Sequence, residues 1–146
     1  MSTKNYPIGT HFAGPVKLGS SSILLSSDTG GILTAKTLTV DEANGQTYIL
    51  DGGTGVAIAL PVPTKGARIK FIVGAAFATD FVITATGAIM EGCIIEAGAV
   101  QDVDGATTLT LEDGTENVGD FIEMISDGTN WYVFGNFLTA ASITPA

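Results

Sequence analysis

The stretch that decides the fold is FIEMISDGTNWYVF, residues 121–134. Two runs rich in β-branched, aromatic and aliphatic residues flank the tripeptide Asp127-Gly128-Thr129. Aspartate and glycine tolerate the positive φ that tight turns require, so this stretch predicts two strands joined as a hairpin. The same tripeptide occurs at residues 113–115, and both copies are explained as turns rather than as an internal repeat.

Strand signals of the same kind recur toward the N-terminus, separated by turn signals about 8–12 residues apart. Asn44-Gly45 and residues 51–55 are predicted turns, and Pro61 and Pro63 end the strand before them because proline cannot donate to a ladder. We expect no helix beyond one turn at residues 41–45. About eight to ten short strands predict an all-β fold, a β-sandwich or jelly-roll-like single domain. The upstream strands are predicted at 32–40, 47–50, 56–60, 68–73, 81–86, 94–95, 100–103 and 107–111.

The two ends of the chain differ from its middle, so we assign residues 31–138 to the sandwich and 139–146 to a C-terminal tail. Residues 1–30 are rich in proline, glycine and serine, which opposes a helix. They also carry apolar residues that a purely solvating tail would not need. We predict an extended N-terminal arm that docks on another surface; the alternative is a flexible terminus. The contact candidates in this arm are Tyr6, Ile8, His11, Phe12, Val16 and Leu18.

The composition indicates contact with other chains. Hydrophobic residues make up 45% of the 146 residues and charged residues only 14%, against about 25% in typical domains. We infer burial between subunits as well as within one; the alternative is a very large self-contained core. The net charge of −9 argues against nucleic acid as a partner. Lys65, Arg68 and Lys70 form one small basic cluster, interpreted as a solvated strand face, as an anion patch, or as a contact for a neighbouring subunit's carboxylates.

Neither a membrane span nor a secretory signal is expected, so the chain is predicted to stay in a cytoplasm until it assembles. The residues that catalysis needs are few. Cys93 lies in an apolar run and is predicted to be a buried, inert thiol. His11, the single histidine, lies in the arm, which is a poor place to hold catalytic geometry. We therefore predict that the protein is not an enzyme.

Neither a metal nor another cofactor is expected. Asp102, Asp104 and Gly105 resemble part of a calcium loop but lack its other ligands, so they are predicted to form a turn. Trp131 and Tyr132 are adjacent and must point to opposite faces of a strand. We interpret Trp131 as a contact residue at the surface or at an interface, with a core position as the equal alternative.

Several segments resemble structural proteins of tailed phages, namely capsid decoration (cement) proteins and some tail-fibre domains. The resemblance rests on residues 119–123 with 126–133, on Leu60-Pro61 with 66–73, on 82–85 with 87–89, and on 9–16. No single motif among these is highly specific. The resemblance implies a β-sandwich or jelly-roll domain, usually a homotrimer, on the outer surface of the capsid, where it bridges major capsid proteins.

The expected function is therefore that of a virion decoration protein with itself and the major capsid protein as partners. The first alternative is a tail-fibre or spike domain that binds a host glycan through Trp131, Tyr132 and Tyr48. The second is a small polysaccharide hydrolase that uses paired carboxylates.

Overall fold

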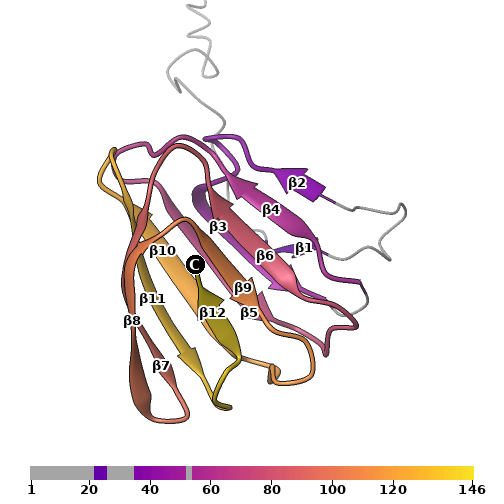
Figure 1. The fold of residues 1–146 in the computed structure, drawn as a ribbon. Coiled ribbons are helices and arrows are strands. Elements are labelled where there is room, and N and C mark those ends of the chain that lie inside the picture. Colours follow the sequence, from indigo (N-terminus) through magenta and orange to yellow (C-terminus); the bar gives the residue numbers. More distant parts are fainter. Residues whose placement is uncertain (1–21, 26–34, 52–53) are drawn as a thin grey trace, which may run out of the picture.

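The computed structural model of the protein describes residues 22–25, 35–51 and 54–146 (Figure 1). Within these residues the chain forms twelve β-strands and no helix. The strands are β1 (Ser22–Leu25), β2 (Ala35–Thr37), β3 (Asn44–Leu50), β4 (Ala57–Leu60), β5 (Arg68–Val73), β6 (Phe81–Ala85), β7 (Met90–Glu96), β8 (Ala99–Ala106), β9 (Thr108–Leu111), β10 (Phe121–Ser126), β11 (Trp131–Phe137) and β12 (Ile143–Pro145).

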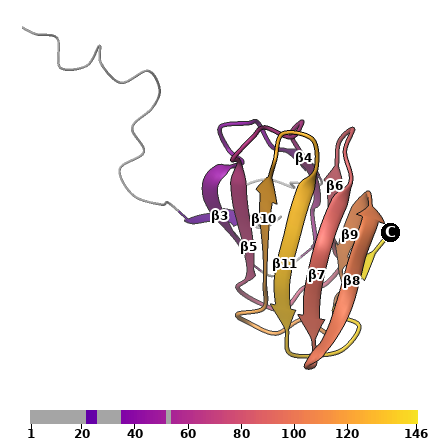
Figure 2. The ribbon, with the colours of Figure 1, turned by 90° about the vertical axis from the view of Figure 1, so that its left-hand side faces the viewer.

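The strands form two sheets that face each other. One sheet has seven strands in the order β1-β3-β5-β10-β11-β7-β8, and the other has five in the order β12-β9-β6-β4-β2. The five-stranded sheet lies in front in Figure 1, and Figure 2 looks onto the seven-stranded sheet. The predicted all-β sandwich is confirmed.

The first six strands alternate between the two sheets. β1, β3 and β5 are parallel neighbours in one sheet, and β2, β4 and β6 are parallel neighbours in the other. Paired residues lie 25 positions apart between Ser22 and Thr47, and 23 apart between Thr47 and Lys70. The chain therefore winds as a coil with one strand in each sheet per turn. This order departs from a jelly roll, whose strands are antiparallel.

The later strands are joined mainly by antiparallel pairing. The predicted hairpin is present as β10 and β11, with Ser126 opposite Trp131. In its turn, Asp127 Oδ1 accepts hydrogen bonds from the backbone N–H groups of Thr129 at 2.7 Å and Asn130 at 2.8 Å. Gly128 has a φ of +99°, the conformation for which glycine was expected. β7 and β8 form a second hairpin, and β7 runs parallel to β11.

The core lies between the sheets and follows the two-residue period of the strands. In β5, Ile69, Phe71 and Val73 are buried, whereas the residues between them are not. The ring of Phe71 stacks on that of Tyr48 from β3, with centroids 5.6 Å apart. Because such alternation holds in most strands, each strand presents one set of side chains to the core and the other set to the outside.

Two predicted boundaries and one predicted turn differ from the structure. β1 falls within residues 1–30, so part of the predicted arm belongs to the seven-stranded sheet. β12 falls within residues 139–146 and pairs with β9, so the predicted tail belongs to the sandwich. The Asn44-Gly45 dipeptide is not a hairpin turn: Gly45, with a φ of +79°, sits at a bulge where β3 shifts register against β5.

A buried carboxylate ties two segments together at one end of β10. Asp120 is 2% exposed. Its Oδ1 accepts a hydrogen bond from the backbone N–H of Leu138 at 3.1 Å, and its Oδ2 accepts one from the N–H of Asn117 at 2.8 Å. Hydrogen bonds to a charged acceptor are stronger than neutral ones, so Asp120 holds the loop before β10 against the end of β11.

We expect Asp120→Ala to lower the free energy of unfolding by about 3 kcal/mol, because it leaves backbone donors without their acceptor. Urea denaturation followed by tryptophan fluorescence measures this loss. The matched control is Asp127→Ala, which changes an exposed turn and should cost clearly less. Equal losses for the two variants would contradict the role given to Asp120.

Tyr48 makes the fold sensitive to alkali. Burial, with a smaller contribution from the charge of Glu42, raises the pKa of Tyr48 to about 12 from 10.0. The neutral tyrosine donates its hydroxyl proton to the backbone carbonyl of Glu42 at 3.2 Å. Since the folded pKa is the higher one, this stabilisation is complete below pH 10 and is lost as the pH rises toward 12.

We therefore expect the free energy of unfolding to fall between pH 10 and pH 12, and to fall less steeply in Tyr48→Phe. Denaturation midpoints across this range give the slope. Tyr132→Phe is the control, because Tyr132 is exposed and its removal should change the slope less. An unchanged slope in Tyr48→Phe would refute the assignment.

Candidate functional site

The predicted contact residues fall into two groups. Tyr6, Ile8, His11, Phe12, Val16 and Leu18 lie outside the described residues. Trp131 is described, and it is fully buried in the core of a single chain. It therefore cannot contact a second molecule, and the interpretation of Trp131 as an interface residue was wrong. Trp131 lies on the same side of β11 as Val133 and Phe137, which are also buried.

Tyr132 is the outward member of the aromatic pair. It is 37% exposed, and its hydroxyl donates to Asp127 Oδ2 at 3.1 Å. That hydrogen bond raises the pKa of Tyr132 and, together with stronger bonds from the turn backbone, lowers the pKa of Asp127. Tyr48, like Trp131, is buried. Only one of the three residues considered for sugar stacking therefore lies on the surface.

The seven-stranded sheet carries a continuous apolar surface on the side away from the core, which we call the outer face. Phe134 is 48% exposed, Ile95 43% and Val100 73%, and the remaining apolar members are half-buried apart from Tyr132. The strands that carry it lie side by side in Figure 2. The apolar residues of the outer face are Ile49, Ile72, Phe121, Ile125, Tyr132, Phe134, Ile95 and Val100.

Strand register aligns several of these residues in one row. Phe121 is opposite Ile72 on one side and Asn136 on the other, and Asn136 is in turn opposite Ile95. Ile95 is opposite Val100 at the edge strand β8. The row is apolar across the sheet except for Asn136. Exposed apolar surface of this extent marks a contact site on a soluble protein more often than chance exposure.

On the outer face, the basic side chains and the acids Glu91 and Asp102 lie on opposite sides of β11, whereas Glu123 lies on the basic side. The basic side chains Arg68 and Lys70 both come from β5. Arg68 Nε lies 3.1 Å from Glu123 Oε1 in β10, and Lys70 Nζ lies 4.4 Å from the ring centroid of Phe121. The acids beyond the centre of the sheet are Glu91 in β7, opposite Tyr132, and Asp102 in β8, opposite Cys93.

Two predictions about β7 and β8 need correction. Cys93 is exposed on the outer face rather than buried, because the apolar run that contains it alternates and only Ile94 points into the core. Asp102, Asp104 and Gly105 lie within β8 rather than in a turn, close to the point where β8 shifts register against β7. Within the described residues, no group of three or more histidine, cysteine or acidic side chains is placed to hold a metal.

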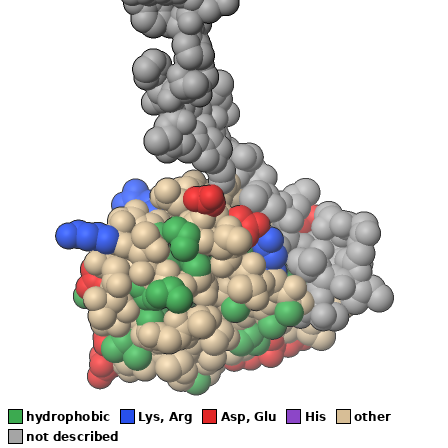
Figure 3. All heavy atoms as spheres, turned by 90° about the horizontal axis from the view of Figure 1, so that it is seen from above, with side chains coloured by type: hydrophobic (Ala, Val, Ile, Leu, Met, Phe, Trp, Pro, Cys, Tyr) green, Lys and Arg blue, Asp and Glu red, His purple; other side chains and the backbone are tan. Residues whose placement is uncertain are grey.

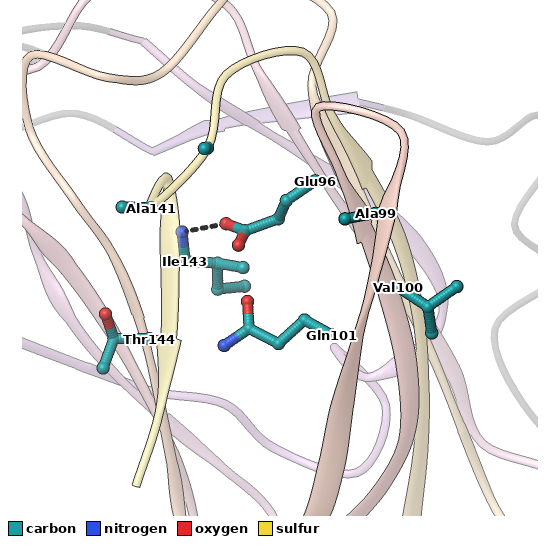
Figure 4. A pocket seen from close by; sticks show the side chains of 8 residues that line it. Glu96, Ala99, Val100, Gln101, Ala141, Ile143 and Thr144 are labelled. Atoms are coloured by element: carbon teal, nitrogen blue, oxygen red, sulfur yellow. Dashed lines mark hydrogen bonds between the residues drawn. The ribbon is translucent and has the colours of Figure 1, made fainter.

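A hollow of about 430 Å³ lies where the edge strands β8 and β12 approach each other (Figure 4). Glu96 and Gln101 point into it, whereas Val100 points away. Glu96 Oε1 accepts a hydrogen bond from the backbone N–H of Ile143 at 2.8 Å, which links the two sheets at this open side. The rest of the lining is mostly alanine and backbone, so the hollow offers one carboxylate that is already engaged.

Two carboxyl groups, those of Asp80 and Asp113, lie close together. Asp80 Oδ1 accepts a hydrogen bond from the backbone N–H of Asp113 at 2.9 Å. The hydrogen bond between the two side chains is the largest of several causes, repulsion from Glu116 among them, that raise the pKa of Asp113. The pair joins the start of β6 to the first Asp-Gly-Thr turn and does not line the hollow of Figure 4. The hydrogen bond between the two segments gives the pair a structural explanation.

The upper end of the sandwich shows a different surface. In Figure 3, hydrophobic side chains there form several small separate patches within polar surface. The outer face is the larger apolar feature because its members adjoin one another through strand register.

In the described part of the chain there is no helix with the length and hydropathy that a membrane-spanning segment needs.

Comparison of the sequence with protein-family models gave no match, and comparison with curated proteins gave none either.

The sequence analysis did not predict the outer face, although the sequence of β11 contains one signal for it. In β11 the polar Asn136 lies on the same side of the strand as Tyr132 and Phe134. A polar residue marks the outward set of a strand, so this alternation assigns Trp131 to the core and the other two aromatics to the surface.

Trp131 is the single tryptophan, so its burial is directly measurable. We expect blue-shifted fluorescence in the native protein and almost no quenching by iodide, because no part of the side chain is open to solvent. Unfolding in urea should restore full quenching. Tyr132→Trp in a Trp131→Phe background is the matched control, and its outward indole should be quenched without denaturant. Efficient quenching of the native wild-type protein would contradict the assigned orientation.

Proposed function

We propose that this protein is a capsid decoration protein of a tailed phage, which acts as a symmetric oligomer and stabilises the head by bridging major capsid proteins. The observation that carries the proposal is the outer face. The sandwich already has a complete core between its sheets, and yet one sheet presents a second apolar surface to the outside. A protein with this arrangement gains stability from a second layer of contact, supplied by other copies or by a shell.

The engagement of the acidic side chains supports a structural role. Asp120 and Asp127 hold backbone N–H groups of loops and turns, and Glu42 forms an ion pair with Lys36 at 2.6 Å. These contacts account for the carboxylates as parts of the scaffold. The phage setting and the three-fold symmetry rest on the resemblance of the sequence, and both remain predictions.

A tail-fibre or spike domain that binds a glycan is the alternative. Sugar recognition by stacking needs exposed aromatic rings, and burial of Trp131 and Tyr48 leaves Tyr132 and Phe134 as the exposed ones among the residues that the structure describes. Phe134 lies beside Glu123 and Cys93 on a flat sheet rather than in a cleft. The geometry therefore favours contact between proteins over sugar binding.

The test uses heads assembled from the major capsid protein of the phage that encodes the chain. We expect the purified protein to bind these heads with a fixed number of copies per lattice point and to raise the temperature at which they rupture. Cosedimentation and calorimetry measure the two effects. Labelling at the tail tip alone, or no binding to heads, would reject the proposal.

Two variants separate the contributing surfaces. Deletion of residues 1–18 tests the predicted arm and should weaken head binding if the arm docks on the shell. Phe134→Asp places a charge in the middle of the outer face and should weaken assembly without unfolding the chain, because Phe134 lies outside the core. Lys65→Glu, an exposed charge change outside the outer face, is the control for both.

A further inference from the structure

We propose that the outer face is a self-complementary interface through which two copies of this chain pair about a two-fold axis that runs along β11. A two-fold interface uses the same patch on both subunits, so it requires that each feature of the patch meets its complement after rotation. The outer face meets this condition at two places, the charge pair of Lys70 with Asp102 and the apolar row.

Strand order determines which parts of the two copies meet. β11 has β10 and β5 on one side and β7 and β8 on the other. Rotation about an axis along β11 brings the outer face of a second copy onto the first and exchanges the two sides. β10 of one copy then faces β7 of the other, β5 faces β8, and β11 faces itself.

The charges become complementary under this exchange. Lys70 of β5, Glu123, Phe134, Cys93 and Asp102 of β8 occupy one register row across the sheet. Lys70 of one copy therefore approaches Asp102 of the second copy, and the rotation produces this pair twice. Aligned sheets cross at about −30°, so the axis lies about 15° from the direction of β11, and side chains away from it are displaced along the strands. Over that displacement Arg68, in the same strand as Lys70, can replace it opposite Asp102 of the second copy. Glu91 lies in β7 and therefore faces β10.

The apolar row also meets itself. Phe121 and Ile72 on one side of β11 approach Ile95 and Val100 of the second copy. Phe134 lies on the axis and approaches Phe134 of the second copy. The polar Asn136 lies on the axis as well, where its amide can donate to and accept from its own copy. Within this row no apolar side chain faces a charge, whereas Ile125 of β10, in the row of Tyr132, faces Glu91 of the second copy.

The size of the overlap determines how strong the pairing can be. Five strands at about 4.8 Å spacing and six residues at about 3.3 Å give roughly 500 Å² per copy in projection. Specific interfaces bury about 800 Å² per partner, so this overlap is near the lower limit. We expect a dimer that dissociates on dilution, and that a repeating surface such as a shell would reinforce.

The inference takes its biological setting from the proposed function and names the contact between copies within it. It does not depend on capsids for its test, so the two can fail separately. It also differs from the three-fold symmetry expected from the resemblance, because a single self-complementary face closes with two copies.

The test is a charge exchange on the full-length chain. Sedimentation equilibrium over a range of concentrations should show a mass between one and two times 14.9 kDa for the wild type. Lys70→Glu and Asp102→Lys should each weaken pairing at least about tenfold, because each places like charges opposite one another. An equimolar mixture of the two variants should recover pairing, since the new carboxylate at position 70 then meets the new ammonium at position 102.

Further variants and one labelling experiment test the same interface independently. Phe134→Asp should abolish pairing, and no partner variant should restore it, whereas Lys65→Glu should leave pairing unchanged. Maleimide labelling of Cys93 should slow as concentration rises, because this exposed thiol becomes covered. A monomer at all concentrations, a trimer mass, or a mixture that does not recover would overturn the inference. Loss of pairing on deletion of residues 1–18 would assign the contact to that segment and would also overturn it.

Discussion

The burial of alternate side chains between two sheets is the constraint on which the rest of this structure depends. Each strand has a period of two, so a residue that enters the core commits its neighbours to the outside. In β5 the buried Ile69 and Phe71 leave Arg68 and Lys70 on the outer face. In β11 the buried Trp131 and Val133 leave Tyr132 and Phe134 there. The outer face is thus placed by the core, while its chemistry remains free to vary.

The features that sequence reasoning predicted correctly are those decided locally. The hairpin at residues 121–134 follows from an Asp-Gly turn between two apolar runs, and the turn conformation depends only on its own residues. The features it missed depend on pairing between distant residues. β1 lies in a segment rich in serine and pairs with β3 at an offset of 25 positions, which no local pattern encodes. Asn44-Gly45 has the composition of a turn, and only its pairing with β5 makes it a bulge.

The candidate site was predictable in part for the same reason. The basic residues Arg68 and Lys70 were placed correctly on one strand face, because their alternation with apolar residues is local. Their neighbours, Glu123 and Phe121, come from a strand more than fifty positions later, so the ion pair and the stacking on the ring were not accessible. Cys93 was misassigned because a short apolar run does not reveal which of its members points inward. The predicted arm contacts lie outside the described residues and stay predictions.

The coil made by the first six strands has a consequence for how such a chain can change in length. Each circuit adds one strand to both sheets and takes 22 to 25 residues, as the offsets from Ala35 to Ala57 and from Ala57 to Val82 also show. An insertion or duplication of one whole circuit would widen both layers together and leave the hairpins at the other end undisturbed. Evolution can therefore lengthen this domain in steps of a fixed size, whereas an insertion of half a circuit would send every later strand to the wrong layer.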